Sequence, residues 1–236
     1  MTPPYPHIAV IHHLQQPFLG NAAAPLGAVR EHFGTLPDLD EVDAIVSFGG
    51  EKSAWDPEFE SEVELIREAV AREIPFLGVC LGAQLLAHAL GGEVARLPRR
   101  LVTWAPIEVI ADDPGLGQLP RGAHALHWNE DGIEPPPGAI EVYARPEGGR
   151  AEGFRVGRLA WGVQFHPEVD QAAVDGWYAG WPELLEPAGV TEAGAREADA
   201  RHLPGQAALS TAIFGAFARV AAAERAARPA GRSAQP

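Results

Sequence analysis

The stretch IPFLGVCLGAQLLAHAL, residues 74–90, holds the transition that decides the fold. Its first part, IPFLGV (74–79), is a continuous apolar run, which is typical of a strand covered on both faces. Its second part, LGAQLLAHAL (81–90), has the apolar spacing of a buried helix. Cys80 stands between the two, with a glycine two residues away on each side. This pattern is typical of a nucleophile elbow, in which small neighbours allow a sharp, strained turn that presents the central side chain.

The segments before this elbow repeat the alternation of strand and helix. HIAVIHH (7–13) and DAIVSF (43–48) are short apolar runs that predict strands. APLGAVREHF (24–33) and SEVELIREAVARE (61–73) have apolar spacing that predicts helices. The resulting order of strand, helix, strand, helix, strand and helix favours a parallel sheet with helices on both faces.

The chain beyond the elbow changes character. Short apolar runs separated by turn residues predict an antiparallel extension of the sheet; they cover 101–110, 124–128, 139–145, 154–159 and 160–165. Two helical segments follow, at about 170–180 and 191–220. We therefore expect an α/β fold, a three-layer sandwich with a mostly parallel central sheet and an antiparallel extension, as one domain over residues 1–224. Residues 225–236 lack apolar periodicity and are expected to form a disordered tail.

Composition and charge narrow the class of protein. The net charge of −14 argues against nucleic acid and anionic membranes as partners, because phosphate binding needs clustered lysine and arginine. The hydrophobic fraction of 46% is ordinary for a soluble globular protein, and no run approaches the roughly 20 apolar residues that cross a bilayer. The first residues, MTPPYPHIAV, show no secretory signal. We therefore expect a cytoplasmic protein.

Cys80 is the single cysteine of the chain, so an intrachain disulfide and a multi-cysteine metal site are both excluded. A lone cysteine is either an inert buried side chain or a reactive thiol, and the elbow favours the reactive thiol. A helix N-terminus and a nearby imidazolium would each favour the thiolate. The backbone N–H of Leu81 is the natural donor to an oxyanion that forms beside the sulfur.

A cysteine nucleophile needs a base and a group that orients the base. The best candidate is QFHPE (164–168), at the end of the last short strand. Residues two apart in an extended chain point the same way, so His166 and Glu168 are expected on one side, where the carboxylate can orient the imidazole. Glu168 also has a second interpretation, as a cap for the helix that begins near Asp170.

Metal and cofactor chemistry have little support in the sequence. His12 and His13 are adjacent in an expected strand and so point to opposite faces, and we expect no metal site there. No phosphate-cradling glycine loop of the Walker type is present. We therefore expect no cofactor, and any ATP chemistry would come from a partner.

Two motifs together give the chain a family resemblance. GVCLGAQ (78–84), followed by QFHPE (164–168), resembles the class I (triad) glutamine amidotransferase family, and most of all the stand-alone relatives of the amidotransferase portion of GMP synthase. The resemblance extends over about residues 7–220, because the SFGG turn (47–50) and AWGV (160–163) also fall in family order. It implies the flavodoxin-like fold of that family.

The resemblance also implies a mechanism. Cys80 would attack the side-chain amide of glutamine, His166 would protonate the departing ammonia, and water would hydrolyse the γ-glutamyl thioester. The N–H groups of Gly50 and Leu81 would hold the oxyanion, and Gln84 would help to bind the glutamine. The ammonia would pass to a separate synthetase or other acceptor, since we expect no synthetase domain in the chain.

Two segments depart from the family pattern and keep other functions open. LVTW (101–104) stands where close relatives often carry EIGW, and HWNED (127–131) stands where they often carry HWHGD. A hydrolase of another γ-glutamyl amide or peptide is therefore an alternative. A non-catalytic regulatory module of the same fold is a third possibility, against which the complete triad argues.

Overall fold

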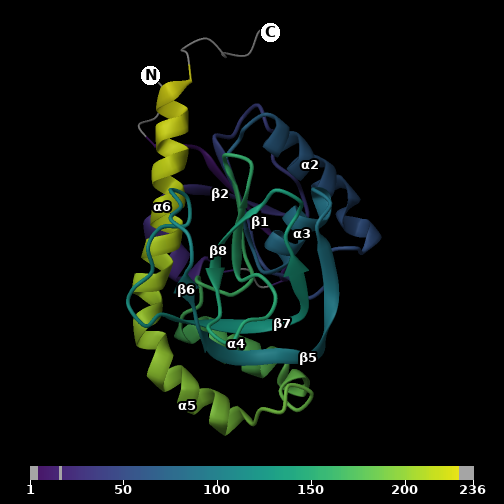
Figure 1. Ribbon diagram of the computed structural model, residues 1–236, viewed down its shortest axis with the longest axis vertical. Helices are drawn as coiled ribbons and strands as arrows, with labels where there is room; N and C mark the ends of the chain where they lie inside the picture. The colour runs from purple at the N-terminus through teal and green to yellow at the C-terminus, as the bar shows by residue number, and fades with distance from the viewer. Residues whose placement is uncertain (1–4, 16–17, 229–236) are drawn as a thin grey trace.

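The computed structural model describes residues 5–15 and 18–228. In order across the central sheet the strands are β2 (Val29–Phe33), β1 (Ile8–His12), β3 (Ala44–Ser47), β4 (Phe76–Val79), β10 (Ala160–Val163), β9 (Gly153–Val156), β8 (Ile140–Ala144) and β6 (Glu108–Val109). The first five strands in this order lie parallel, and the last three extend them in antiparallel fashion (Figure 1). This confirms the predicted α/β fold with a mostly parallel sheet and an antiparallel extension.

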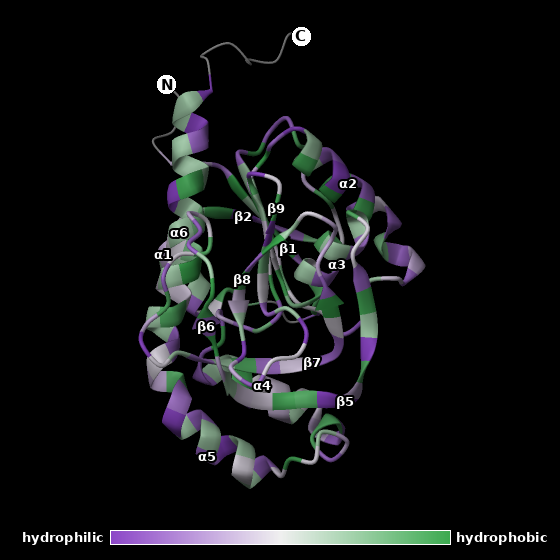
Figure 2. Cartoon of the chain, in the orientation of Figure 1, coloured by the Kyte–Doolittle hydropathy of each residue, from purple (hydrophilic) through white to green (hydrophobic). Residues whose placement is uncertain are grey.

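Helices cover both faces of this sheet and complete the three layers (Figure 1). On one face lie α2 (Glu60–Ala71) and α3 (Leu81–Ala89), close to the predicted helices at 61–73 and 81–90. On the other face lie the short α1 (Ala23–Leu26) and the long α6 (Gln206–Ala227). Figure 2 shows α2 with hydrophilic and hydrophobic residues in alternation, as expected of a helix that buries one side only.

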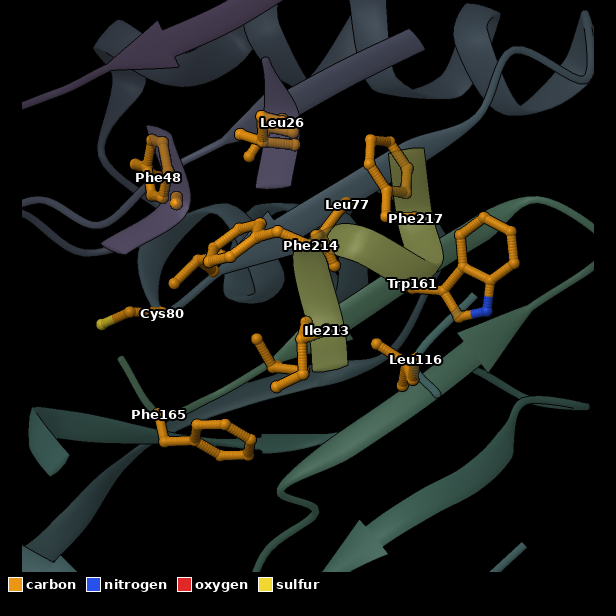
Figure 3. Packing of buried hydrophobic residues seen from close by; sticks show 14 of the residues in the cluster. Leu26, Phe48, Leu77, Cys80, Leu116, Trp161, Phe165, Ile213, Phe214 and Phe217 are labelled. Atoms are coloured by element: carbon orange, nitrogen blue, oxygen red, sulfur yellow. The ribbon is translucent and has the colours of Figure 1, made fainter. Parts of the chain in front are cut away.

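Two separate cores result from this arrangement. Ile8 of β1 packs into the core beneath α6, whereas the next residue, Ala9, packs into the core beneath α2. Figure 3 shows the larger core, in which Phe217 of α6 lies near Trp161 of β10, whereas Phe214 of the same helix lies toward Phe48. Because both faces are buried, the parallel strands are continuous apolar runs in the sequence.

The strand register brings two distant loops together. Val79 at the end of β4 lies opposite Val163 at the end of β10. Both strands end at this pair, so the chain leaves the sheet at neighbouring points, with Cys80 on one side and Gln164 on the other. Open α/β sheets bind ligands beyond the carboxyl ends of their parallel strands, and this edge is such a place.

A second sheet of two strands lies apart from the central one. It consists of β5 (Glu93–Pro106) and β7 (His124–Glu134), and it packs against α4 (Gln171–Gly180) in a third apolar core. The segment 101–110, predicted as part of the extension, is therefore divided. Most of it belongs to this second sheet, and only Glu108–Val109 joins the central one.

The segment 24–33, predicted as one helix, folds mainly as a strand. The helix ends after Leu26, because Gly27 has a φ of 73°, and residues 29–33 then pair in parallel with β1. This edge strand is only partly covered. The apolar residues Leu26, Val29 and Phe33 are three and four positions apart, a spacing that also occurs on a helix face, which explains the wrong prediction.

The C-terminal helical region is longer than predicted and is broken once. α5 (Glu192–His202) and α6 are joined by a 3-10 turn at Leu203–Gly205, and α6 continues to Ala227, past the expected domain boundary at residue 224. Residues 229–236 of the expected tail lie outside the described residues. By length and composition the stretch Glu192–Ala227 could cross a membrane, but 44% of its most apolar window is buried in the protein. The apolar side chains of α6 that fill the core are Leu209, Ile213, Phe214 and Phe217.

Further 3-10 turns lie at Gly20–Ala22, Pro57–Phe59 and Pro182–Leu184.

Candidate active site

Cys80 occupies the sharp turn between β4 and α3. Its φ of 52° lies in the left-handed region, which costs a residue with a side chain of the order of 1 kcal/mol, and the neighbouring structure must hold it there. The Cys80 N–H donates to the carbonyl of Val163 at 2.8 Å. A Cβ added to Gly78 would lie 2.4 Å from the Gly82 carbonyl carbon, and one added to Gly82 would lie 2.0 Å from the Ser47 oxygen. The two glycines are therefore required by space, as in a nucleophile elbow.

His166 and Glu168 lie on one side of the extended segment after β10. The His166 Nδ1 and Glu168 Oε1 atoms are 2.7 Å apart, and both side chains are almost fully buried. The His166 N–H donates to the Leu126 carbonyl at 2.9 Å, which fixes the backbone of the segment. The helix cap considered for Glu168 is supplied instead by Asp170, whose carboxylate accepts from the Ala173 N–H at 2.9 Å.

Gly49 lies against the side chains of both Cys80 and His166. A Cβ added there would lie 3.0 Å from the Cε1 atom of His166 and 3.4 Å from the Cβ atom of Cys80. The Nε2 atom of His166 is buried and has no hydrogen-bond partner among the described residues. The nitrogen opposite the Glu168 contact therefore remains for a reaction partner.

The electrostatic environment favours a protonated His166. Burial alone would lower the pKa of His166, but the charges of Glu168 and of a Cys80 thiolate outweigh burial and raise the pKa to about 10. An imidazolium beside the sulfur is the arrangement in which a cysteine acts as a nucleophile.

Cys80, His166 and Glu168 all line one pocket of about 240 Å³. The pocket has a polar group of lining residues and an aromatic and apolar group. Besides His166 and Glu168, the polar residues are His12, His13, Glu51, Lys52, Gln84, Arg100, Asn129, Glu130, Asp131 and Glu183. The larger apolar residues are Leu14, Phe18, Phe48, Trp128, Trp177, Trp181 and Leu184. Such a combination suits a small molecule with a charged end and an uncharged end.

The residues predicted to bind substrate also reach this pocket region. Gly50 lines the pocket, and a Cβ added to it would lie 2.7 Å from Leu81 Cδ2, so the two residues are in close contact. Neither N–H takes part in a loop or capping hydrogen bond of the described residues. Gln84 lines the pocket, but its Nε2 already donates to the Asp131 carbonyl and to Gln164, each at 3.3 Å.

Two residues beside the proposed catalytic groups were not predicted from the sequence to contact them. Gln164 Nε2 lies 3.8 Å from the Cys80 sulfur as a donor, although the sequence showed this residue only as part of a motif. The Trp177 ring meets the His166 ring edge to face, with 4.8 Å between the centroids. Trp177 lies on α4, and its position in the helical pattern gives no sign of a site.

The two segments that depart from the family pattern differ in position. No residue of LVTW (101–104) lines the pocket, and the Nε1 of Trp104 donates instead to Asp199 at 2.8 Å. In the other segment, residues 128–131 all line the pocket. Asp131 accepts from the Ser53 hydroxyl at 2.9 Å, and burial raises the pKa of its carboxyl above the usual range. Of the two departures from the family pattern, only the one at 127–131 therefore bears on the pocket, through residues 128–131.

The adjacent histidines turn to different partners. His12 Nε2 lies 2.8 Å from Glu31, and His13 Nε2 lies 2.8 Å from Glu62. Within residues 5–15 and 18–228, no group of three or more histidine, cysteine, aspartate or glutamate side chains is placed to hold a metal ion.

Comparisons with known proteins point to one family. The family model described as glutamine amidotransferase class-I matches residues 28–176. A glutamine-hydrolysing GMP synthase of Aeropyrum pernix is 32% identical over 158 residues, which are 63% of this chain and 30% of that protein. One subunit of the glutamine-hydrolysing GMP synthase of Methanocaldococcus jannaschii is 32% identical over 130 residues, which are 55% of this chain and 66% of that relative. The chain therefore spans less than two thirds of the length of either relative.

A solved structure shows the same fold over nearly the whole chain. A glutamine amidotransferase from Thermotoga maritima superposes with a TM-score of 0.81 at 25% identity, covering 92% of this chain and 98% of that one. These comparisons confirm the resemblance that the elbow and the QFHPE motif indicated.

Proposed function

Since this chain belongs to the class I glutamine amidotransferase family, we propose that it hydrolyses the side-chain amide of glutamine with Cys80 as the nucleophile. One observation carries the proposal. Beside Cys80 lies a buried His166 whose Nδ1 is held 2.7 Å from Glu168 and whose Nε2 has no partner among the described residues. A base oriented on one side and free on the other is what nucleophilic catalysis requires.

The first half of the reaction forms a thioester. The Cys80 thiolate attacks the amide carbon, and the carbonyl oxygen becomes an oxyanion that accepts from the N–H groups of Gly50 and Leu81. The carbon–nitrogen bond then breaks while the His166 imidazolium gives its Nε2 proton to the departing nitrogen. Ammonia leaves, and the γ-glutamyl group stays bound to sulfur.

The second half restores the enzyme. Neutral His166 takes a proton from water, and the hydroxide attacks the thioester carbon. The carbon–sulfur bond breaks, glutamate leaves, and the thiolate faces the imidazolium again. Throughout, Glu168 keeps the Nδ1 proton in place and stabilises the charged ring.

We further propose that the ammonia passes to a separate synthetase or other acceptor in the cytoplasm. The relatives support this, because one is a whole GMP synthase and another is one component of a GMP synthase made of separate chains. The chain is proposed to act without a cofactor, because the chemistry needs only the thiol, the imidazole and water.

A second candidate substrate is a γ-glutamyl amide that carries an apolar group on its nitrogen. The leaving nitrogen must approach Nε2 of His166, and Trp177 lies edge to face against that ring at 4.8 Å. Trp128 and Trp181 line the same pocket. An aromatic or aliphatic substituent on the nitrogen would therefore find apolar contacts that ammonia does not use.

The test is glutamate release by the purified chain from L-glutamine and, in parallel, from γ-glutamyl anilide, with Cys80→Ala as the control. Release from glutamine that disappears in the variant supports the first candidate. Release from the anilide with little from glutamine favours the second. No release from either substrate, together with no labelling of Cys80 by a glutamine-mimicking chloroketone, would contradict both and favour a non-catalytic module.

A further inference from the structure

A buried cluster beside the pocket has no role in the mechanism above. His13 directly follows β1, and its Nε2 lies 2.8 Å from Oε2 of Glu62 on α2. The other carboxylate oxygen of Glu62 accepts from the Ser47 hydroxyl at 2.7 Å. The side chains of His13 and Glu62 are only 8% and 5% exposed. A polar pair taken so far out of water must serve either packing or the site.

The hydrogen bonds give both nitrogens of the His13 ring a partner. His13 Nδ1 lies 3.0 Å from the Phe48 carbonyl, and because a carbonyl only accepts, Nδ1 carries a proton. Nε2 lies against one oxygen of Glu62, whose other oxygen accepts from the Ser47 hydroxyl. Burial alone would lower the pKa of His13, but the hydrogen bond and charge of Glu62, with the carbonyls of Phe48 and Gly49, raise it. The surroundings of His13 therefore favour its imidazolium form.

This pair supports the backbone from Phe48 to Gly50. The Phe48 carbonyl accepts from His13 and also from the Gly82 N–H at 3.2 Å. A Cβ added to Gly50 would lie 2.7 Å from the Cβ atom of His13 and 2.7 Å from Leu81 Cδ2, so Gly50 is wedged between the two side chains. The segment has no freedom to move toward His13.

The orientation of the peptide groups follows from this support. In a trans peptide the C=O and N–H groups point in opposite directions, so a carbonyl held toward His13 turns the next N–H away from it. The Phe48 carbonyl does this for the Gly49 N–H, and the Gly49 carbonyl, which also bonds to His13, does it for the Gly50 N–H. Gly49 belongs to this Phe48–Gly50 segment and lies against the side chains of Cys80 and His166. A glycine pair has wide backbone freedom, and without an anchor these peptide groups could rotate.

We propose that His13 and Glu62 are positioning residues, whose ion pair holds the Phe48–Gly50 backbone with its N–H groups presented to the oxyanion beside Cys80. The inference rests on the proposed function, because it assigns the pair to the same reaction. The pair touches neither the thiol nor the imidazole in any hydrogen bond of the described residues, so it acts through the backbone.

Two variants of His13 separate its two contacts. His13→Asn places an amide nitrogen near the position of Nδ1 and keeps the bond to the Phe48 carbonyl, whereas His13→Gln places it near Nε2 and keeps the bond to Glu62. A purely structural pair would lose stability in both variants without a difference in turnover. We expect His13→Asn, which loses the ion pair with Glu62 but keeps the donor to the Phe48 carbonyl, to lose about tenfold in kcat. We expect His13→Gln, which loses that donor, to lose roughly 100-fold in kcat with little change in KM, the range seen when one oxyanion donor is lost.

Alkylation of Cys80 by iodoacetamide is the second readout, since displacement at a saturated carbon forms no oxyanion. In His13→Gln the alkylation rate should stay near that of the wild type while kcat falls. A folded His13→Gln with the kcat of the wild type, or an alkylation rate that falls together with kcat, overturns the inference. If His13→Gln does not fold, Glu62→Gln takes its place with the same expectations at a smaller loss, about tenfold. A wild type inactive on every γ-glutamyl amide would instead overturn the proposed function, and this inference with it.

Discussion

The Cys80 N–H donates to the Val163 carbonyl at 2.8 Å, so the elbow and the QFHPE segment leave the sheet at a single point. The bond continues the parallel pairing of β4 with β10 by one residue. It places Cys80, the proposed nucleophile, beside the segment that carries His166, the proposed base, although the two lie far apart in the sequence. The backbone at this point is therefore held by sheet pairing, and sites built on strands and helices are positioned more precisely than sites on loops.

We expect Glu168→Gln to move the alkaline limit of activity to lower pH. The pKa of His166 is raised to about 10 against burial, with Glu168 as the first of the charges that raise it. Removing that charge lowers this pKa, so the imidazolium that protonates the leaving nitrogen is lost at a lower pH. The measurement is kcat/KM for glutamine from pH 6 to 11, with Glu168→Asp, which keeps the charge, as the control. Identical alkaline limbs for the wild type and Glu168→Gln would exclude this role of Glu168.

The raised pKa of His166 also predicts how the stability of the fold depends on pH. The pKa of His166 is higher in the folded protein, about 10, than its unfolded value near 6.5. His166 therefore contributes its full stabilisation below pH 6.5, and this stabilisation is lost as the pH rises toward 10. Glu168→Gln should therefore lose stability relative to the wild type mainly below pH 6.5, and the difference should shrink as the pH approaches 10. Chemical denaturation at both ends of this range measures the difference. A gap that grows with pH would mean that His166 is neutral in the folded protein.

Gly82→Ala should destabilise the fold, whereas Gly176→Ala should not. A Cβ on Gly82 would lie 2.0 Å from the Ser47 backbone oxygen, but one on Gly176 would meet nothing within 4 Å. The first change overpacks the elbow at a cost of about 1–3 kcal/mol, a fall in Tm of roughly 2–12 °C for a chain of this size. The second adds helix propensity to α4 worth roughly 0.5–1 kcal/mol. Thermal melts of the two variants measure the difference in Tm. Equal Tm values would show that the backbone of the elbow can shift to accommodate a Cβ at position 82.

Gln164→Leu should make the thiolate harder to form. The Nε2 of Gln164 lies 3.8 Å from the sulfur and donates to it, and a donor to a charged acceptor stabilises the charge. The rate of Cys80 alkylation at neutral pH should fall by about tenfold, equivalent to ~1.4 kcal/mol. Gln84→Leu is the matched control, because Gln84 contacts Gln164 but not the sulfur. An alkylation rate that falls equally in both variants would assign the effect to general repacking.

The elbow was predictable from the sequence because its signals are local. The buried strand β4 and helix α3 follow from a continuous apolar run and a helical pattern, and the glycines around Cys80 follow from the space that a tight turn allows. The edge strand β2 was not predictable in the same way. Its apolar residues continue a helix-like spacing that begins at Leu26, and only its pairing with β1 identifies it as a strand.

The surroundings of the triad depend on contacts that no local pattern encodes. His13 meets Glu62 only because β1 and α2 lie beside each other in the fold, and Gln164 meets the sulfur only through the β4–β10 register. Trp177 faces His166 because α4 packs across the segment that carries the base, and nothing in the spacing of α4 distinguishes it from a core residue. A motif identifies the reacting groups, and the tertiary packing decides which residues support them.

Trp177→Leu should change the choice of substrate more than the chemistry. The indole lies against the ring proposed to protonate the leaving nitrogen, so it would contact a substituent on that nitrogen but not ammonia itself. Loss of one aromatic contact of about 0.5–1.5 kcal/mol predicts a fall of about 3- to 10-fold in the ratio of kcat/KM for γ-glutamyl anilide to that for glutamine. The ratio is the right quantity, because Trp177 is buried and any loss of folded protein lowers both rates equally. Trp104→Leu is the matched control, since Trp104 packs in the same apolar region as Trp177 but does not line the pocket. A ratio that falls equally in both variants would mean that the aromatic wall serves packing alone, and glutamine would then be favoured as the substrate.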